Sequence, residues 1–314
     1  MSKNLICLKS ELDLFQDVPM QLGIDSSTFV EIHPIASLTE HSPIEFLISS
    51  SGNQYVDISH TLLHLQLQVL KADDTLLTDT EKLKVAPINY LLNTIFSECG
   101  VFLNDKQVST QVNYAYRSYL ESLLFYSKNA HDSLLTTSFF HKDTANHHDS
   151  ITADNVGFKK RSELSNLSKV IDLIGPIHFD LANQPKLLIH GVSVRIKLER
   201  NKNSFCLMSA TNDFKINILS ASLYVRKVNI APSIIVAHEK ALEKGVIKMP
   251  IRRVEIKSFS LSAGIASEHI ANAFLGQLPN RLIMGLVSNE AYNGAYSKNP
   301  FKFHHFDLSY LAVL

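Results

Sequence analysis

The sequence is short of the residues that usually mark secreted proteins and metalloproteins. Its 314 residues include no tryptophan and only three cysteines. These cysteines, Cys7, Cys99 and Cys206, are too far apart in the sequence for a disulfide framework or a paired-cysteine zinc site, so we expect a reducing, intracellular setting. The first residues lack an apolar segment of secretory length, and no run approaches the roughly 18 apolar residues of a membrane span.

Charge is also scarce, and it is balanced. Charged residues make up 19% of the chain, against roughly 25% in an average soluble domain. Because 30 basic residues offset 30 acidic ones, net charge gives no argument for nucleic acid, a membrane or an acidic substrate as partner. Hydrophobic residues make up 45%, which predicts either a large private core or surfaces shared with partners.

Motifs of enzymes and metal sites are missing as well. The chain has no nucleophile elbow, phosphate-binding loop, dinucleotide fingerprint or His-Glu-x-x-His motif. His60 and His64 share a strand face, but lie about 13 Å apart at roughly 3.3 Å per residue. The adjacent pairs His147-His148 and His304-His305 would point apart in an extended chain. We therefore expect no metal site.

Three other residue groups have simple structural interpretations. Cys99, beside Gly100, is expected to be a small buried thiol rather than a nucleophile. The run Lys159-Lys160-Arg161 is expected to be solvated on a polar loop. Arg252-Arg253 would place one arginine at an interface or beside a carboxylate. We assign no catalytic, cofactor-binding or metal-binding residue, expect no cofactor, and predict that the protein is not an enzyme.

Strict alternation of apolar and polar residues is the clearest positive signal. In Leu63–Val69 the apolar residues fall on one strand face, and His64, Gln66 and Gln68 fall on the other. Val192–Leu198 repeats the pattern. A sheet with one dry and one wet face is usually antiparallel and packs in a sandwich or barrel.

The rest of the chain predicts further strands with few helices. Asn104-Asp105 is a candidate two-residue hairpin turn, because both residues tolerate positive φ. A polar excursion is expected over residues 140–168. Helices are predicted at Ile88–Phe96, Tyr116–Leu123 and Pro232–Lys244, with Arg117 and Glu121 facing away from the apolar stripe of the second. Strands are predicted at Thr28–Ile35, Ile44–Ile48, His60–Leu70, Lys186–Glu199, Phe214–Val228, Ile251–Leu261, Arg281–Val287 and Phe301–Val313. Without strand–helix alternation, the class is all-β with helical insertions.

A series of short blocks runs along residues 11–314. The blocks are Phe29–Pro34, Pro43–Phe46, Tyr55–Ser59, Lys84–Asn89, Val101–Val108, Tyr116–Glu121, Phe205–Met208, Tyr224–Val228, Pro250–Glu255, Gly276–Pro279, Asn293-Gly294 and Lys298–Phe301. In their order and spacing these blocks resemble hexon-like double jelly-roll major capsid proteins, which are encoded by Polinton (Maverick) elements and adintoviruses, and by copies integrated in animal genomes.

The resemblance implies tandem jelly-roll sandwiches that assemble as a homotrimer in a capsid lattice. It implies an N-terminal arm over residues 1–27, a first roll with helical and loop insertions over 28–209, and a partial second roll over 210–314. Partners would be other copies and a penton-like minor capsid protein, with encapsidated double-stranded DNA contacted only indirectly. The protein would be found in the virion, and in the host nucleus or cytoplasm during assembly, without being secreted.

The resemblance also raises an expectation about the C-terminus. Family members continue past the strand at Phe301, whereas this sequence stops within an apolar pattern, so a truncated or endogenised copy is expected. Two alternatives remain open at this point: a single-roll penton-like subunit, and a domesticated lectin-like binding module.

Overall fold

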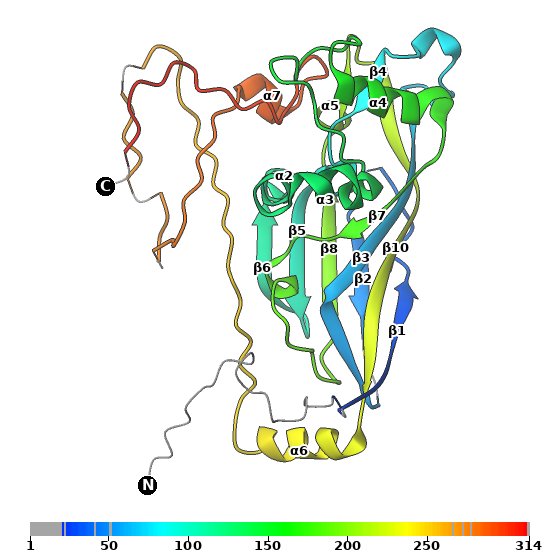
Figure 1. The fold of residues 1–314 in the computed structure, drawn as a ribbon, viewed down its shortest axis with the longest axis vertical. Helices are drawn as coiled ribbons and strands as arrows, with labels where there is room; N and C mark the ends of the chain where they lie inside the picture. The colour runs from blue at the N-terminus through cyan, green and yellow to red at the C-terminus, as the bar shows by residue number, and fades with distance from the viewer. Residues whose placement is uncertain are drawn as a thin grey trace, which may run out of the picture.

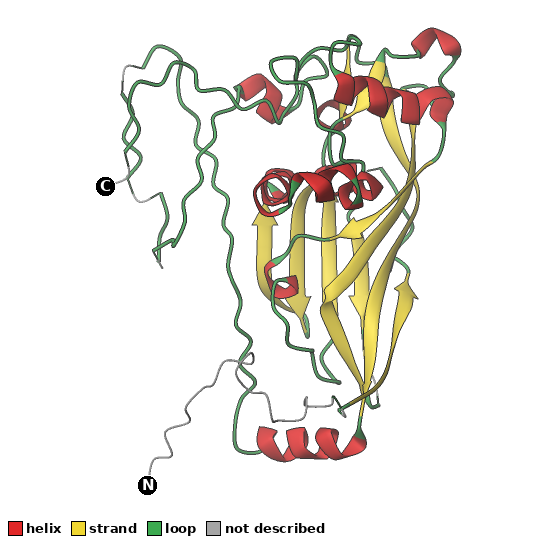
Figure 2. Cartoon of the chain, viewed as in Figure 1, coloured by secondary structure: helices red, strands yellow, loops and turns green. Residues whose placement is uncertain are grey.

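Two facing β-sheets form the body of the protein, with helices at both ends of the long axis and across one side (Figures 1 and 2). This computed structural model describes residue 21 and residues 23–40, 42–49, 52–265, 267–271, 273–276 and 278–312. Within these residues, no helix has the length and apolarity that a bilayer span needs.

The first sheet contains the two longest strands of the fold. Its order is β1-β10-β3-β7, and all neighbours are antiparallel. The strands span Ile24–Ile32 (β1), Gln54–Lys71 (β3), Ile171–Pro176 (β7) and Phe214–Ile230 (β10). The alternation seen in the sequence determines which face of β3 packs in the core. Leu63, Leu65, Leu67 and Val69 are buried, while the intervening polar residues point outward.

The second sheet packs its apolar residues against the first. Its order is β2-β8-β5-β6, also antiparallel. The strands span Ile44–Ile48 (β2), Phe96–Leu103 (β5), Lys106–Val112 (β6) and Val194–Arg200 (β8). Asn104 and Asp105 join β5 to β6 with φ of 45° and 62°, so the predicted hairpin turn is confirmed.

The order of the strands identifies the architecture. Each sheet combines strands from the early and late parts of the chain, and together the sheets hold eight strands in two antiparallel layers. This is the arrangement of a jelly roll, a fold found in viral capsid and lectin domains. The predicted class, all-β with helical insertions, is confirmed.

Short helices and a small sheet fill the insertions between strands. A two-stranded sheet pairs β4 (Val85–Pro87) with β9 (Leu207–Ser209). Helix α6, which begins at Pro232 and ends before Gly245 as predicted, covers the opposite end of the roll (Figure 1). The helices are α1 (Leu91–Thr94), α2 (Tyr114–Phe125), α3 (Lys128–Asp132), α4 (Val156–Ser165), α5 (Asn203–Cys206), α6 (Pro232–Leu242) and α7 (Asn289–Asn293).

The expected domain boundary after residue 209 falls in the wrong place. Strand β10 lies between β1 and β3, so residues 214–230 complete the first roll instead of opening a second. At the other end, most of the arm expected over residues 1–27 lies outside the described residues, and β1 already begins at Ile24. The first roll therefore runs from β1 to β10.

Beyond α6, the described residues contain α7 and extended or turning chain, and no strand. The strands predicted at 251–261 and 281–287 are not formed, and neither is the described part of the one predicted at 301–313. A strand needs a partner with which to share backbone hydrogen bonds, and alternation alone does not provide one. We call residues 246–287 the carboxyl-terminal arm.

Candidate assembly surfaces

Histidines do not gather into a metal centre in the described part of the chain, where no three potential ligands converge. His60 Nδ1 lies 2.8 Å from Asp57, and His64 Nε2 lies 2.6 Å from Asp172. His304 and His305 do not point apart as expected, since no strand forms there. Their rings stack with centroids 4.8 Å apart.

The two described cysteines are inert core residues. Cys99 and Cys206 are both buried, and burial raises the pKa of each thiol to about 12. A thiol with such a pKa stays protonated at neutral pH and is a poor nucleophile. Cys7 lies outside the described residues.

The basic run Lys159-Lys160-Arg161 is solvated only in part: Lys159 and Lys160 are exposed as expected, whereas Arg161 is buried. It lies in α4, where Asn155 caps the first turn by accepting from the Phe158 amide. The Arg161 side chain is fully buried: its Nη2 lies 2.6 Å from Asp143, and its Nε donates to the Pro87 carbonyl at 2.7 Å. The sequence pattern missed this because the acceptors lie on other segments.

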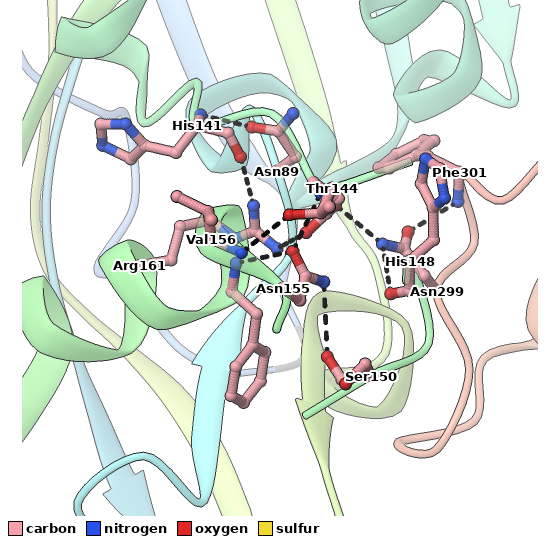
Figure 3. A network of polar contacts seen from close by, with 12 residues as sticks. Asn89, His141, Thr144, His148, Ser150, Asn155, Val156, Arg161, Asn299 and Phe301 are labelled. Atoms are coloured by element: carbon pink, nitrogen blue, oxygen red, sulfur yellow. Dashed lines mark hydrogen bonds and ion pairs between the residues drawn. The ribbon is translucent and has the colours of Figure 1, made fainter. Parts of the chain in front are cut away.

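A polar clamp, made of Asp143, Asp149, Arg161, Asn299 and Lys302, fastens a late segment of the chain onto this insertion. Figure 3 shows Arg161 and Asn299 of this clamp. Asn299 Nδ2 donates to Asp143 at 2.9 Å and to the His148 carbonyl at 3.2 Å. Asp149 accepts from the Asn299 amide at 2.8 Å and from Lys302 Nζ at 2.6 Å. The expected surface excursion over residues 140–168 is therefore partly a docking site for residues 299–302.

Aromatic stacking supports the same attachment. The ring of Phe301 stacks on Tyr119 with centroids 4.0 Å apart, and Tyr292 of α7 stacks on Tyr116 at 5.7 Å. The two tyrosines belong to the apolar stripe predicted for α2. Part of that stripe thus receives the carboxyl-terminal segment.

A second buried network lies under α2. Arg117 is fully buried, with Nε 3.0 Å from Glu121 and Nη2 2.8 Å from Asp180. The i,i+4 ion pair expected on the side of the helix away from the apolar stripe is present, and its side chains are 0% and 13% exposed, so this side of α2 is buried as well. Burial by itself would raise the pKa of Glu121, but the hydrogen bond from His178 and the charge of Arg117 hold it below its ordinary value.

The described part of the carboxyl-terminal arm contains no helix or strand and exposes large apolar side chains. It leaves α6, runs along the side of the roll next to β6 and returns to α7 (Figure 1). Val246, Leu275 and Leu278 are 79%, 75% and 92% exposed. In the described part of the arm, one backbone–backbone hydrogen bond is formed: the Leu286 carbonyl accepts from the His304 amide at 3.0 Å. Such an apolar surface is typical of a segment that needs a partner.

An open groove of about 310 Å³ crosses the outer face of the first sheet. Each strand contributes one apolar residue to it: Phe29 from β1, Tyr224 from β10, Leu62 from β3 and Ile174 from β7. Paired His64 and Asp172 complete the lining. Outer faces of sandwich sheets are usually polar, so this band of apolar residues is a candidate contact surface.

Comparison with known proteins gives limited similarities. No protein-family model matches the chain. An uncharacterized protein of Caenorhabditis elegans is 26% identical over 295 residues, which cover 90% of this chain and 68% of the nematode protein. These values relate the two chains without assigning a function to either.

Solved structures similar to the chain come from viruses and virophages. A chain of the Sputnik virophage is 11% identical with a TM-score of 0.47, covering 72% of this chain and 52% of that one. A chain of the PBCV-1 capsid is 10% identical with a TM-score of 0.42, covering 71% and 46%. The mavirus major capsid protein is 14% identical with a TM-score of 0.39, covering 75% and 52%. The chain thus spans about half the length of these proteins, and the jelly-roll assignment depends on its own strand order.

Proposed function

We propose that the protein is a structural, non-enzymatic capsid subunit of a Polinton- or adintovirus-like element, which self-assembles into trimeric capsomers. The observation that carries the proposal is the strand order, β1-β10-β3-β7 facing β2-β8-β5-β6, which is that of a jelly roll. The family named in the proposal comes from the sequence blocks that resemble hexon-like capsid proteins. Since other proteins also use this fold, the fold alone does not decide between them.

The two-roll organisation belongs to this proposal. Strand β10 ends the first roll at Ile230, so a second roll would begin after it. In the carboxyl-terminal arm, apolar and polar residues alternate over 254–257 and again over 258–261, and Ile251, Phe259 and Leu261 are between 39% and 47% exposed. Alternation with exposed apolar residues is what a strand shows when its partners are missing. We propose that a neighbouring copy supplies those partners.

The remaining parts of the proposal concern location and partners. The subunit would be in the virion, packed against further copies of itself and a penton-like minor subunit, with packaged double-stranded DNA contacted only indirectly. An endogenised copy would retain these surfaces whether or not it still forms particles.

The test is expression of the 314-residue chain, followed by size-exclusion chromatography with light scattering and negative-stain microscopy. Trimers or larger shells are expected. A chain that stays monomeric at all concentrations contradicts the proposal, and a monomer that binds on a glycan array would instead support the lectin-like alternative.

A further inference from the structure

We infer that the groove on the outer face of the first sheet receives segment 247–253 of a second copy of the chain. The inference depends on the proposed self-assembly and names the two surfaces that meet. It places an apolar, basic peptide segment in an apolar, acidic groove.

The groove has carboxylates at both of its edge strands. Asp172 lies on β7 and its side chain is 60% exposed, although it accepts from His64 and from Gln66. Glu31 on β1 is exposed and lies directly opposite Tyr224 in the sheet register, so both side chains share the outer face. Phe29, on the same edge strand as Glu31, is 55% exposed. Arg226 lies opposite Phe29 in the register and is paired with Asp57 at 3.2 Å. The groove therefore offers apolar surface flanked by negative charge.

The segment has the complementary character. Residues 247–253 carry three basic side chains, Lys248, Arg252 and Arg253, and no acidic one. Ile247 is 46% and Ile251 39% exposed. Both arginines are exposed, and neither has a carboxylate at ion-pair distance among the described residues. In an extended chain Ile251 and Arg253 share one face, whereas Arg252 points to the other.

A second copy is the occupant because the chain holds this segment away from its own groove. The Lys248 carbonyl accepts from Lys186 Nζ at 2.6 Å, and the Val254 amide donates to Asp180 at 3.3 Å. These contacts fix the segment on the β6 side of the roll, and β1 lies on the opposite side (Figure 1). A contact between two different surfaces of identical chains is heterologous, and it forms a closed ring when the rotation between copies closes.

The groove supplies the orientation of the contact, and other surfaces would supply part of its strength. A stable interface buries more than about 1,000 Å² in total, which is more than one groove of this size provides. Charge pairs in such contacts set the register and exclude wrong partners. The charge pair we assign is Arg253 with Asp172 of the neighbouring copy.

A charge-swap experiment tests the pairing. Asp172→Arg and Arg253→Glu are each expected to raise the dissociation constant of the oligomer at least about tenfold, measured by sedimentation velocity. The double variant Asp172→Arg/Arg253→Glu is expected to restore assembly to within about threefold of the wild type. Arg252→Glu is the matched control, because it makes the same charge change on the other strand face. Thermal unfolding of each variant confirms that it is folded.

Cross-linking identifies the occupant directly. A photoreactive phenylalanine at position 29, in a mixture of ¹⁴N- and ¹⁵N-labelled chains, is expected to give mixed-label cross-links to peptides containing residues 247–253. Cross-links within one chain, or to another segment, overturn the inference.

The outcomes also separate this inference from the proposed function. If the wild type assembles but both single swaps leave the dissociation constant unchanged, the inference fails and the capsid proposal stands. If the wild type does not assemble, both fail. If Arg252→Glu weakens assembly as much as Arg253→Glu, the assigned pair is wrong.

Discussion

The side-chain amide of Asn299 donates to the carboxylate of Asp143 at 2.9 Å, joining residues 156 positions apart in the sequence. The other oxygen of that carboxylate lies 2.6 Å from Nη2 of Arg161, which is fully buried. One carboxylate therefore serves a buried charge and a distant segment of the chain at the same time. The polar clamp thereby couples attachment of the carboxyl-terminal segment to the integrity of the insertion around α4.

Removing the shared carboxylate should destabilise the protein strongly. Asp143→Ala leaves the Arg161 guanidinium buried without its counter-charge, which we expect to cost about 3–5 kcal/mol of unfolding free energy. Lys302→Ala is the control, because its side chain is 38% exposed and the loss of its ion pair should cost less than about 1 kcal/mol. Urea denaturation measures both, and equal effects of the two variants would contradict the prediction.

Gly157 in α4 has no room for a side chain. A Cβ there would lie 2.5 Å from the Lys142 carbonyl oxygen and 2.7 Å from that of His141, and backbone atoms cannot easily move away. Gly157→Ala should lower stability by about 1–3 kcal/mol. Gly245→Ala, whose nearest neighbour would be 3.4 Å away, should leave the melting temperature nearly unchanged. Calorimetry of the two variants measures their melting temperatures. A Gly157→Ala protein as stable as the wild type would contradict the prediction.

Folding stability should fall as the pH is lowered from 6.5 to about 4. Burial, followed by the charges of Lys160 and Arg161, lowers the pKa of His141 from 6.5 to about 4. Between these values the unfolded chain binds a proton that the folded chain does not, so unfolding becomes more favourable as pH falls. With partial solvent screening, we expect a loss on the order of 1–2 kcal/mol. Chemical denaturation at a series of pH values should show a shallower slope in this window for His141→Gln, and an unchanged slope would refute the assignment.

The β5–β6 hairpin can be stabilised at its turn. Asp105 has a φ of 62°, a conformation that glycine adopts without strain. Asp105→Gly creates the Asn-Gly pair preferred in type I′ turns and should raise stability by up to about 1 kcal/mol. Asp105→Ala keeps a Cβ at positive φ without the local hydrogen bonding of Asp, so it should not stabilise. A lower melting temperature for the glycine variant than for the wild type would be evidence against this.

Local patterns in the sequence predicted the elements whose formation depends on near neighbours. The alternation of Leu63–Val69, the Asn104-Asp105 turn and the helix that begins at Pro232 all occur in the structure. Each involves only backbone preferences and one buried face. The class of fold followed from them.

Features that depend on distant partners were not predictable. The sequence of Phe214–Val228 does not indicate that this strand inserts between β1 and β3. The predicted domain boundary was misplaced for that reason. Arg161 has the same sequence context as a solvated residue, because its acceptors come from Pro87, His141 and Asp143. The groove could not be predicted either, since its apolar residues come singly from four strands.

The position of β10 has a consequence for how the chain acquires its fold. Within the part of the chain that the structure describes, strand β1 pairs with β10 alone, in a register that sets Ile24 opposite Ile230. During synthesis, therefore, the first strand has no sheet partner until almost the whole roll has left the ribosome. Such long-range closure makes folding slow and leaves the edge of β3 open to pairing with other nascent chains. Chaperone binding to incomplete chains, and a sharp gain in protease resistance once residue 230 is included, would be the signature of this late closure.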